Sequence, residues 1–230
     1  MTQNTKAILY AMVAVLSWST VATAFKIALQ YLTHFEMVLV ASVTAMVIFA
    51  VVLTFQHKWH LLHRFGGKEW GYFALLGLLN PVAYYMVLFK AYDLLPAHVA
   101  QPINYAWPIV LLVMLAVFGG QKIPLGKYLG MLISLSGVAL ISMGSGQGGE
   151  ALPFLGLFLG FMSAFLWAGY WMVNNRNKDL TDGMVALFMT FLFGSVYMAI
   201  GALFVGVHLS TLPGLLAGMY VGGFEMGIPF

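Results

Sequence analysis

Apolar residues follow one another in stretches of about twenty, separated by short clusters of charged residues, glycine and proline. Because the hydrocarbon core of a bilayer is ~30 Å thick, a helix of about 20 residues is needed to cross it. Strict apolar–polar alternation, which is typical of membrane strands, is absent. The pattern therefore predicts seven spanning helices and the start of an eighth near Leu212. The seven are expected at residues 7–30, 35–55, 70–92, 97–119, 125–143, 153–175 and 183–207.

The composition agrees with a lipid environment. Hydrophobic residues make up 62% of the 230 residues and charged residues only 7%, whereas a soluble domain is about 25% charged. The net charge of +3 is small and dispersed, which is not the pattern of a nucleic-acid-binding protein. Cysteine is absent, which excludes disulfides, cysteine metal sites and cysteine nucleophiles.

Basic residues are unevenly distributed between the connections of the predicted helices. Eight of the ten lie before the first helix or in every second connection, and the remaining connections contain none. The positive-inside rule places the basic side in the cytoplasm, so we expect a multi-pass protein with a cytoplasmic N-terminus. The eight are Lys6, Lys58, Arg64, Lys68, Lys122, Lys127, Arg176 and Lys178.

Lys26, Lys90 and Glu225 lie within predicted membrane-spanning segments and are functional candidates, because a polar group at that depth is costly. Lys26 and Lys90 lie near the outer ends of their helices. They either extend to the outer interface or form a cationic rim that attracts a substrate carboxylate. Glu225 lies within the eighth segment, where it binds a substrate ammonium, carries a coupling proton, or makes a structural hydrogen bond between helices.

Proline interrupts the third predicted helix at Pro81, which removes a backbone hydrogen bond to the carbonyl of Gly77. Asn80 and Tyr84 share one helix face at positions i and i+4. Broken helices near the midplane are where transporters build binding sites. We therefore predict a cavity here, with a kinked packing helix as the alternative.

The fourth predicted helix is interrupted by Pro102 and Pro108, and Gln101, Asn104 and Pro108 lie on one face. Gln101 and Tyr105 are also one turn apart. We expect these polar side chains to line the same cavity.

Trp18, Trp107 and Trp167 are among the tryptophans inside predicted spans. They either pack between helices or line a pocket for a flat, apolar substrate. Trp59 and Trp70 lie near predicted interfaces, where indole rings collect.

Small residues recur every fourth position in two helices, which indicates close helix packing and needs no ligand. They are Gly156, Gly160, Ala164 and Ala168 in one helix and Gly126, Gly130 and Ser134 in the other.

The segments around Trp18 and Trp167 share small residues on both sides of the indole, at an offset of 149 residues. Five predicted helices separate them, and an odd number inverts the second copy. A chance match is the alternative. We divide the chain into a five-helix repeat at 1–143, an outer connecting loop at 144–152 and an incomplete second repeat at 153–230. Since the second copy stops in its third helix, we expect the chain to be truncated.

The stretch 78–142 carries a resemblance to a known family. It has Lys90-Ala91-Tyr92 at a helix end, a proline within the next helix, and a glycine-rich exit. Together with Trp18 and the sequence GGFEMGIPF at 222–230, it resembles the EamA-type transporters of the drug/metabolite transporter superfamily. Asn104-Tyr105-x-Trp107-Pro108 followed by Gly120-Gln121-Lys122 resembles the branch that includes aromatic amino-acid exporters.

The resemblance implies an all-α polytopic membrane protein of ten helices in two inverted five-helix repeats, of which about seven and a half are present here. It also implies a secondary transporter in the inner (plasma) membrane of a bacterium, exporting a small metabolite such as an amino acid by alternating access. We expect the substrate cavity, at the midplane between the repeats, to be lined by Trp18, Asn80, Tyr84, Lys90, Gln101, Asn104, Tyr105, Trp107, Trp167 and Glu225.

A channel and a non-transporting membrane protein remain open as alternatives. An intramembrane enzyme is less favoured, because the spans lack a Ser–His, Asp–Asp or metal-binding His–Glu pair. We expect no catalytic residue, metal or cofactor, and no nucleic-acid partner. The expected partners are a small-molecule substrate and the lipid bilayer, with proton coupling and homo-oligomerisation left open.

Overall fold

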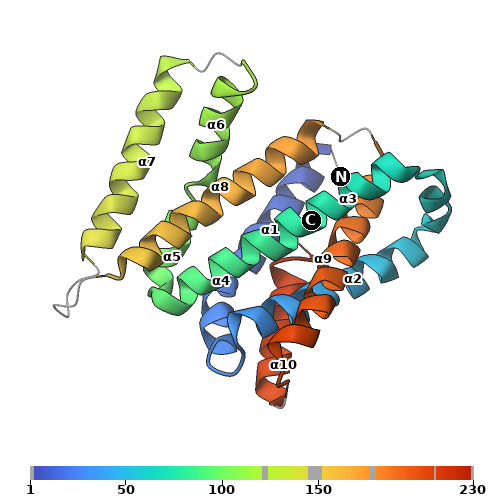
Figure 1. The fold of residues 1–230 in the computed structure, drawn as a ribbon. Helices are drawn as coiled ribbons and strands as arrows, with labels where there is room; N and C mark the ends of the chain where they lie inside the picture. The colour runs from blue at the N-terminus through green and yellow to red at the C-terminus, as the bar shows by residue number, and fades with distance from the viewer. Residues whose placement is uncertain (1–2, 121–123, 145–151, 177–179, 210, 229–230) are drawn as a thin grey trace. The chain divides into compact units, whose positions relative to one another are not determined.

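The computed structural model describes residues 3–120, 124–144, 152–176, 180–209 and 211–228, and these residues form helices with no strand among them (Figure 1). Each predicted helix is confirmed, with ends shifted by a few residues. Two of them consist of shorter pieces, and a short 3₁₀ helix that was not predicted follows α2. The helices are α1 (Gln3–Ala28), α2 (His34–Phe55), η1 (Trp59–Arg64), α3 (Gly67–Gly77), η2 (Leu78–Ala83), α4 (Tyr84–Leu94), α5 (Ala97–Asn104), α6 (Trp107–Val117), α7 (Leu125–Gly144), α8 (Phe154–Arg176), α9 (Gly183–Val205) and α10 (Leu212–Phe224).

Within the described residues, five helical stretches have the length and hydropathy needed to cross a bilayer. These stretches are His34–Phe55, Gly67–Leu94, Ala97–Val117, Phe154–Asn175 and Gly183–Val205. Large apolar side chains stand exposed along them, including Phe55 at 80% and Phe204 at 83%. Water would penalise such a surface and lipid does not, so the chain is an all-α polytopic membrane protein.

Both helix breaks follow from proline. A proline has no N–H to donate, and its ring collides with the carbonyl four residues earlier. Accordingly α3 ends at Gly77, four residues before Pro81, and α5 ends at Asn104, four residues before Pro108. Pro102, in contrast, lies inside α5 without ending it, so only one of the two predicted interruptions of that helix occurs.

The helices form two compact units. The first contains α1, α2, η1, α3, α9 and α10, in which α2 packs against α9 and α10, α1 packs against α10, and α3 packs against α9. The second contains α4 to α8. Helices from both predicted repeats occur in the first unit, and the repeat boundary at 144–152 stays a prediction, since most of that loop lies outside the described residues.

Glycine permits the closest contacts of the first unit. A Cβ on Gly77 of α3 would lie 2.7 Å from the Thr190 carbonyl oxygen and 2.8 Å from the Gly194 nitrogen of α9. A Cβ on Gly222 of α10 would lie 2.5 Å from the Ala41 carbonyl oxygen of α2. The backbones of these helix pairs therefore touch without side chains between them.

A buried carboxylate ties two connections of the first unit together. Glu36 forms a capping box with Thr33 at the start of α2. Its other oxygen, Oε1, accepts the backbone N–H of His208 at 2.7 Å, from the loop between α9 and α10. The short α1–α2 turn is thereby fixed to a segment that lies far away in the sequence.

An ion pair joins the η1 segment to the start of α9. Lys58 Nζ donates to Asp182 Oδ2 at 2.8 Å, and Asp182 Oδ1 accepts the N–H of Met184 as the N-cap of α9. The hydrogen bond from Lys58 is the main cause that lowers the pKa of the Asp182 carboxyl below its usual value, with the Met184 N–H adding to it.

In the second unit, α8 packs against α4, α5 and α6, and α7 contacts α5. The predicted small-residue face of α8 is buried, and a Cβ on Gly160 would lie 3.1 Å from Ile103 of α5. Further along this face, Ala164 and Ala168 form a buried cluster with Val110 of α6. The close packing predicted for this helix is confirmed. The corresponding glycines of α7 have no atom within 4 Å of an added Cβ.

Replacing Gly77 with alanine should destabilise the first unit, because the new methyl group meets α9 backbone that cannot move independently. We expect a loss of about 1–3 kcal/mol, seen as a lower melting temperature in detergent. The control is Gly71→Ala in the same helix, where an added Cβ has no atom within 4 Å. Its higher helix propensity should preserve or raise stability. Equal melting temperatures would contradict the close contact.

The Asp182 carboxylate should make stability depend on pH in the acid range. Since its folded pKa is lowered, the stabilisation is complete above the unfolded pKa of about 4 and is lost as the pH falls through the folded value. For a partly exposed pair we expect about 0.2–1 kcal/mol. Asp182→Asn keeps a helix-capping side chain but should remove this part of the pH dependence of melting between pH 7 and pH 3. Lys58→Met should remove the same pH-dependent part of the stability. If the double variant lost twice the stability that each single variant loses, the two residues would not act as a pair.

Candidate functional site

A chain of hydrogen bonds connects three helices inside the second unit. The hydroxyl of Tyr84 on α4 donates to Asn104 Oδ1 at 3.3 Å, and Asn104 Nδ2 donates to Ser163 Oγ on α8 at 2.9 Å. Ser163 in turn donates to the Gly160 carbonyl at 2.6 Å. Tyr84, Asn104 and Ser163 are 3%, 5% and 0% exposed. Because an unmade hydrogen bond is expensive at this depth, the three side chains hold one another in fixed orientations.

Aromatic rings surround one end of this chain. The ring of Trp167 stacks on Tyr84 with centroids 4.6 Å apart and on Tyr170 at 5.5 Å. Trp107 meets Trp167 edge-on at 6.4 Å and lies nearly parallel to Trp171, at 12° and 6.3 Å. We refer to Tyr84, Trp107, Trp167, Tyr170 and Trp171 as the aromatic cluster. It offers flat apolar surfaces beside neutral hydrogen-bonding groups.

The break between α5 and α6 places two of these residues. Because Pro108 ends α5 at Asn104, the amide of Asn104 sits at a helix terminus. Trp107 then begins α6, which packs along α8. One proline thus positions both a polar and an aromatic member of the site.

Four of the ten predicted site residues, Tyr84, Asn104, Trp107 and Trp167, come together here. Sequence reasoning missed Ser163, Tyr170 and Trp171. Ser163, Trp167 and Trp171 follow one another at intervals of four along α8, so they share one face of that helix. That spacing around Trp167 was the available signal. Trp171 also carries a buried indole Nε1–H for which the described residues provide no acceptor.

Three further candidates have partners outside the aromatic cluster. Gln101 Nε2 donates to the hydroxyl of Tyr105 at 3.1 Å, and the Tyr105 side chain is 49% exposed. Lys90 forms an ion pair with Asp93 at 2.7 Å, one turn further along α4, and both side chains are partly exposed. This pairing gives Lys90 an ionic partner on its own helix, and its role in substrate binding stays a prediction.

The remaining candidates, Trp18, Asn80 and Glu225, lie in the first unit. Trp18 is partly buried on α1. Asn80 has extended backbone angles at the α3–η2 break and is 1% exposed, and neither atom of its amide has a partner among the described residues. Glu225 follows the last residue of α10 as its C-cap rather than lying in mid-helix. The motif residues Gln121 and Lys122 lie outside the described residues.

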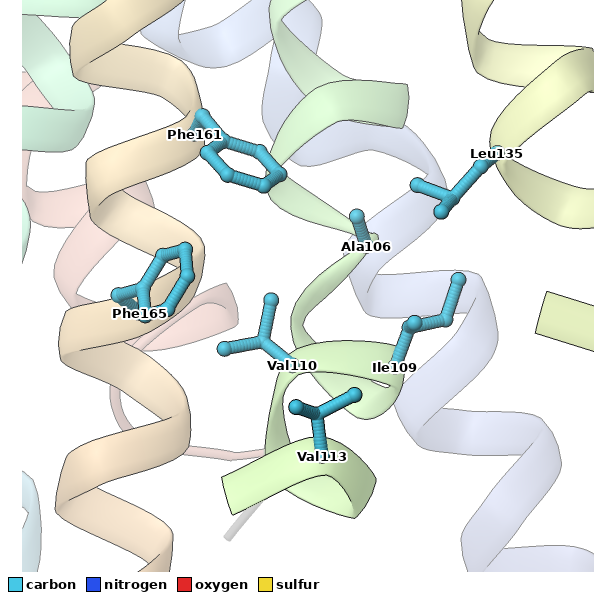
Figure 2. Close-up of a pocket in the computed structure, with 7 residues that line it drawn as sticks. All are labelled: Ala106, Ile109, Val110, Val113, Leu135, Phe161 and Phe165. Carbon is cyan, nitrogen blue, oxygen red and sulfur yellow. The ribbon is translucent and has the colours of Figure 1, made fainter. Parts of the chain in front are cut away.

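An apolar pocket of about 180 Å³ lies on another side of the second unit (Figure 2). Val110 and Val113 of α6, Leu135 of α7, and Phe161 and Phe165 of α8 point into it. Its walls expose only apolar side chains, so it provides no hydrogen bond that would orient a polar substrate. We therefore place the candidate site at the aromatic cluster and the Asn104–Ser163 pair.

The fold and the buried site define a polytopic α-helical membrane protein with neutral polar groups at the depth of its spans. The chain belongs to the EamA-like transporter family, whose sequence model matches residues 5–143. It is 29% identical over 142 residues to the "Uncharacterized transporter YvbV" of Bacillus subtilis (strain 168), an alignment covering 60% of this chain and 45% of that protein. The chain thus spans less than half the length of that relative. A solved crystal structure matches with a TM-score of 0.68 and 20% identity, covering 95% of this chain and 74% of the other, which supports the fold.

Replacing Asn104 with alanine should weaken the second unit, because it removes a buried donor to Ser163 and a buried acceptor for Tyr84. We expect a loss of about 1–3 kcal/mol, measured as a lower melting temperature in detergent. The control is Gln101→Ala, one turn earlier on α5, whose partner is an exposed tyrosine. It should stay within about 0.5 kcal/mol of the parent chain. If the two variants had the same melting temperature, the hydrogen-bond chain would not contribute to stability.

Proposed function

We propose that this chain acts as a secondary transporter that exports a small metabolite, such as an amino acid, by alternating access. Membership of the EamA-like transporter family supports the transport class. The observation that carries the proposal further is the aromatic cluster beside the buried Asn104–Ser163 pair. A packed interior would need neither five neighbouring rings nor a hydrogen-bond chain across three helices.

The chemistry of the cluster favours a substrate with a flat or bulky apolar part and a few hydrogen-bonding atoms. Ring faces bind apolar groups through area and stacking, while an amide and hydroxyls fix the orientation of polar atoms. Trp107 and Trp167 provide the apolar surface, and Asn104 provides both a donor and an acceptor. Among metabolites, an amino acid with an aromatic or large apolar side chain has this combination.

The helix breaks support a moving mechanism over a rigid pore. Irregular backbone at membrane depth is tolerated where it is covered by protein or lines a water-filled cavity, and transporters place binding sites at such breaks. Both breaks carry a buried asparagine, Asn80 at the first and Asn104 at the second. We include Asn80, Trp18 and Glu225 in the proposal as residues that contact the substrate or a coupling proton at another stage of the cycle.

The orientation belongs to the proposal as well. The connection that holds Lys58, Arg64 and Lys68 is one of the basic ones, and the positive-inside rule assigns these to the cytoplasm. The N-terminus would then also be cytoplasmic, and a bacterial inner membrane is the location that this arrangement fits.

Proteoliposomes containing this chain should show saturable counterflow of radiolabelled L-phenylalanine. Trp167→Ala should raise the half-saturation concentration about tenfold, since one stacked ring contributes roughly 0.5–1.5 kcal/mol beyond its area. The control is Trp70→Ala, whose indole is exposed at 42% and lies outside the cluster.

Two outcomes of the counterflow experiment would contradict the proposal. Flux that rises linearly with concentration, without counterflow, would indicate a channel. An absence of flux for a panel of amino acids, in vesicles where the protein is folded, would remove amino-acid export.

A further inference from the structure

A second pocket, in the first unit, has charged walls. It has a volume of about 310 Å³ and lies where the segment after η1, the start of α3 and the segment before α9 meet. Its polar lining consists of Arg64, Glu69, Thr181 and Asp182, with apolar side chains such as Phe65 beside them. This volume is at the lower end of the range for small-molecule sites.

The two carboxylates of this pocket are held in place by helix termini. Glu69 Oε2 accepts the N–H of Gly66 at 2.8 Å, at the N-cap of α3. Asp182 accepts the N–H of Met184 at 3.0 Å and the ammonium of Lys58 at 2.8 Å. A carboxylate has about four lone-pair positions, so both groups keep the capacity to accept a further donor.

Arg64 is different, because its guanidinium has no hydrogen bond or ion pair to any residue that the structure describes. A guanidinium presents a planar fork of donors that matches a carboxylate or phosphate. The lining of this pocket therefore combines one guanidinium that has no partner among the described residues with two carboxylates that are already fixed.

The mixture of charges selects the kind of ligand. A simple anion is attracted by Arg64 but repelled by Glu69 and Asp182. A simple cation is attracted by the two carboxylates but repelled by Arg64. A molecule with an anionic group and an ammonium a few ångströms apart matches both. We propose that this pocket binds a small zwitterion, with its anionic group on Arg64 and its ammonium between Glu69 and Asp182.

Two sources offer this chemistry: a free α-amino acid, and the phosphoethanolamine headgroup of a zwitterionic phospholipid. The pocket lies beyond the end of α2 and at the N-termini of α3 and α9, a level that both can reach. The inference concerns binding alone and does not rest on the proposed transport activity.

The test is equilibrium binding of radiolabelled L-alanine to the purified full chain in detergent, with propionate and ethylammonium as competitors that each keep one charge. We expect L-alanine to bind at least tenfold more tightly than either competitor. Arg64→Gln should weaken binding at least tenfold, and Arg64→Lys should weaken it less, since the charge remains but the fork is lost. Lys68→Gln, a loss of one positive charge outside the pocket lining, is the matched control and should bind like the parent chain.

The source is distinguished in lipid nanodiscs. If the free amino acid is the ligand, L-alanine should bind equally in phosphatidylglycerol and phosphatidylethanolamine discs. If the headgroup is the ligand, L-alanine should bind more weakly in phosphatidylethanolamine discs than in phosphatidylglycerol discs.

The proposal is overturned if L-alanine and glycerophosphoethanolamine bind no better than the singly charged competitors, or if Arg64→Gln and Lys68→Gln behave alike. Binding that depends on Arg64 without any counterflow would refute the transport proposal and leave this site standing. Counterflow without L-alanine binding that depends on Arg64 would refute this binding site and leave the transport proposal standing.

Discussion

The missing N–H of two prolines decides where this molecule holds two buried asparagines inside its spans. In lipid, each backbone carbonyl needs a donor, and a proline cannot provide one to the carbonyl four residues earlier. The helices that contain Pro81 and Pro108 therefore stop at Gly77 and Asn104. Both breaks are followed or ended by an asparagine that is at most 5% exposed. Each of these apolar spans is therefore divided into shorter helices, with the amide of an asparagine at the break.

Close packing of α5 against α8 brings the amide of Asn104 within hydrogen-bonding distance of Ser163. Gly160 of α8 leaves room for Ile103 of α5, and its carbonyl accepts the hydroxyl of Ser163. A side chain at position 160 would push α5 away and lengthen the 2.9 Å bond from Asn104 to Ser163. The same glycine therefore serves both the helix contact and the hydrogen-bond chain. Packing and site cannot be altered separately at this position.

The fold was predictable from the sequence because lipid demands one apolar length per span, and the breaks were predictable because proline acts locally. Tyr84, Asn104 and Trp107 were singled out as polar or aromatic residues near those breaks, and Trp167 as a tryptophan within a span; these four lie together in the structure. Ser163 was not singled out, because a serine in a helix of small residues looks like a packing residue.

Gln101 and Tyr105 were expected to line the cavity with Asn104, because they lie one helical turn apart in the interrupted helix. In the structure α5 ends at Asn104, Gln101 donates to Tyr105, and Tyr105 is 49% exposed, so their place in the cavity stays a prediction. The hydrogen bond from the His208 N–H to Glu36 joins two connections that are far apart in the sequence. No local sequence pattern predicts such a contact.

The distribution of charge limits what the proposed transporter can carry. The aromatic cluster and its hydrogen-bond chain contain no charged side chain, whereas guanidinium and carboxylate groups occur together in the pocket beyond the span ends. A substrate with a net charge would lose its counter-ion on entering the neutral site, at a cost of several kcal/mol. A zwitterion loses less, because its own two charges remain paired at short range. The neutral cluster of the second unit and the mixed charges of the pocket in the first unit therefore each favour a cargo that has no net charge.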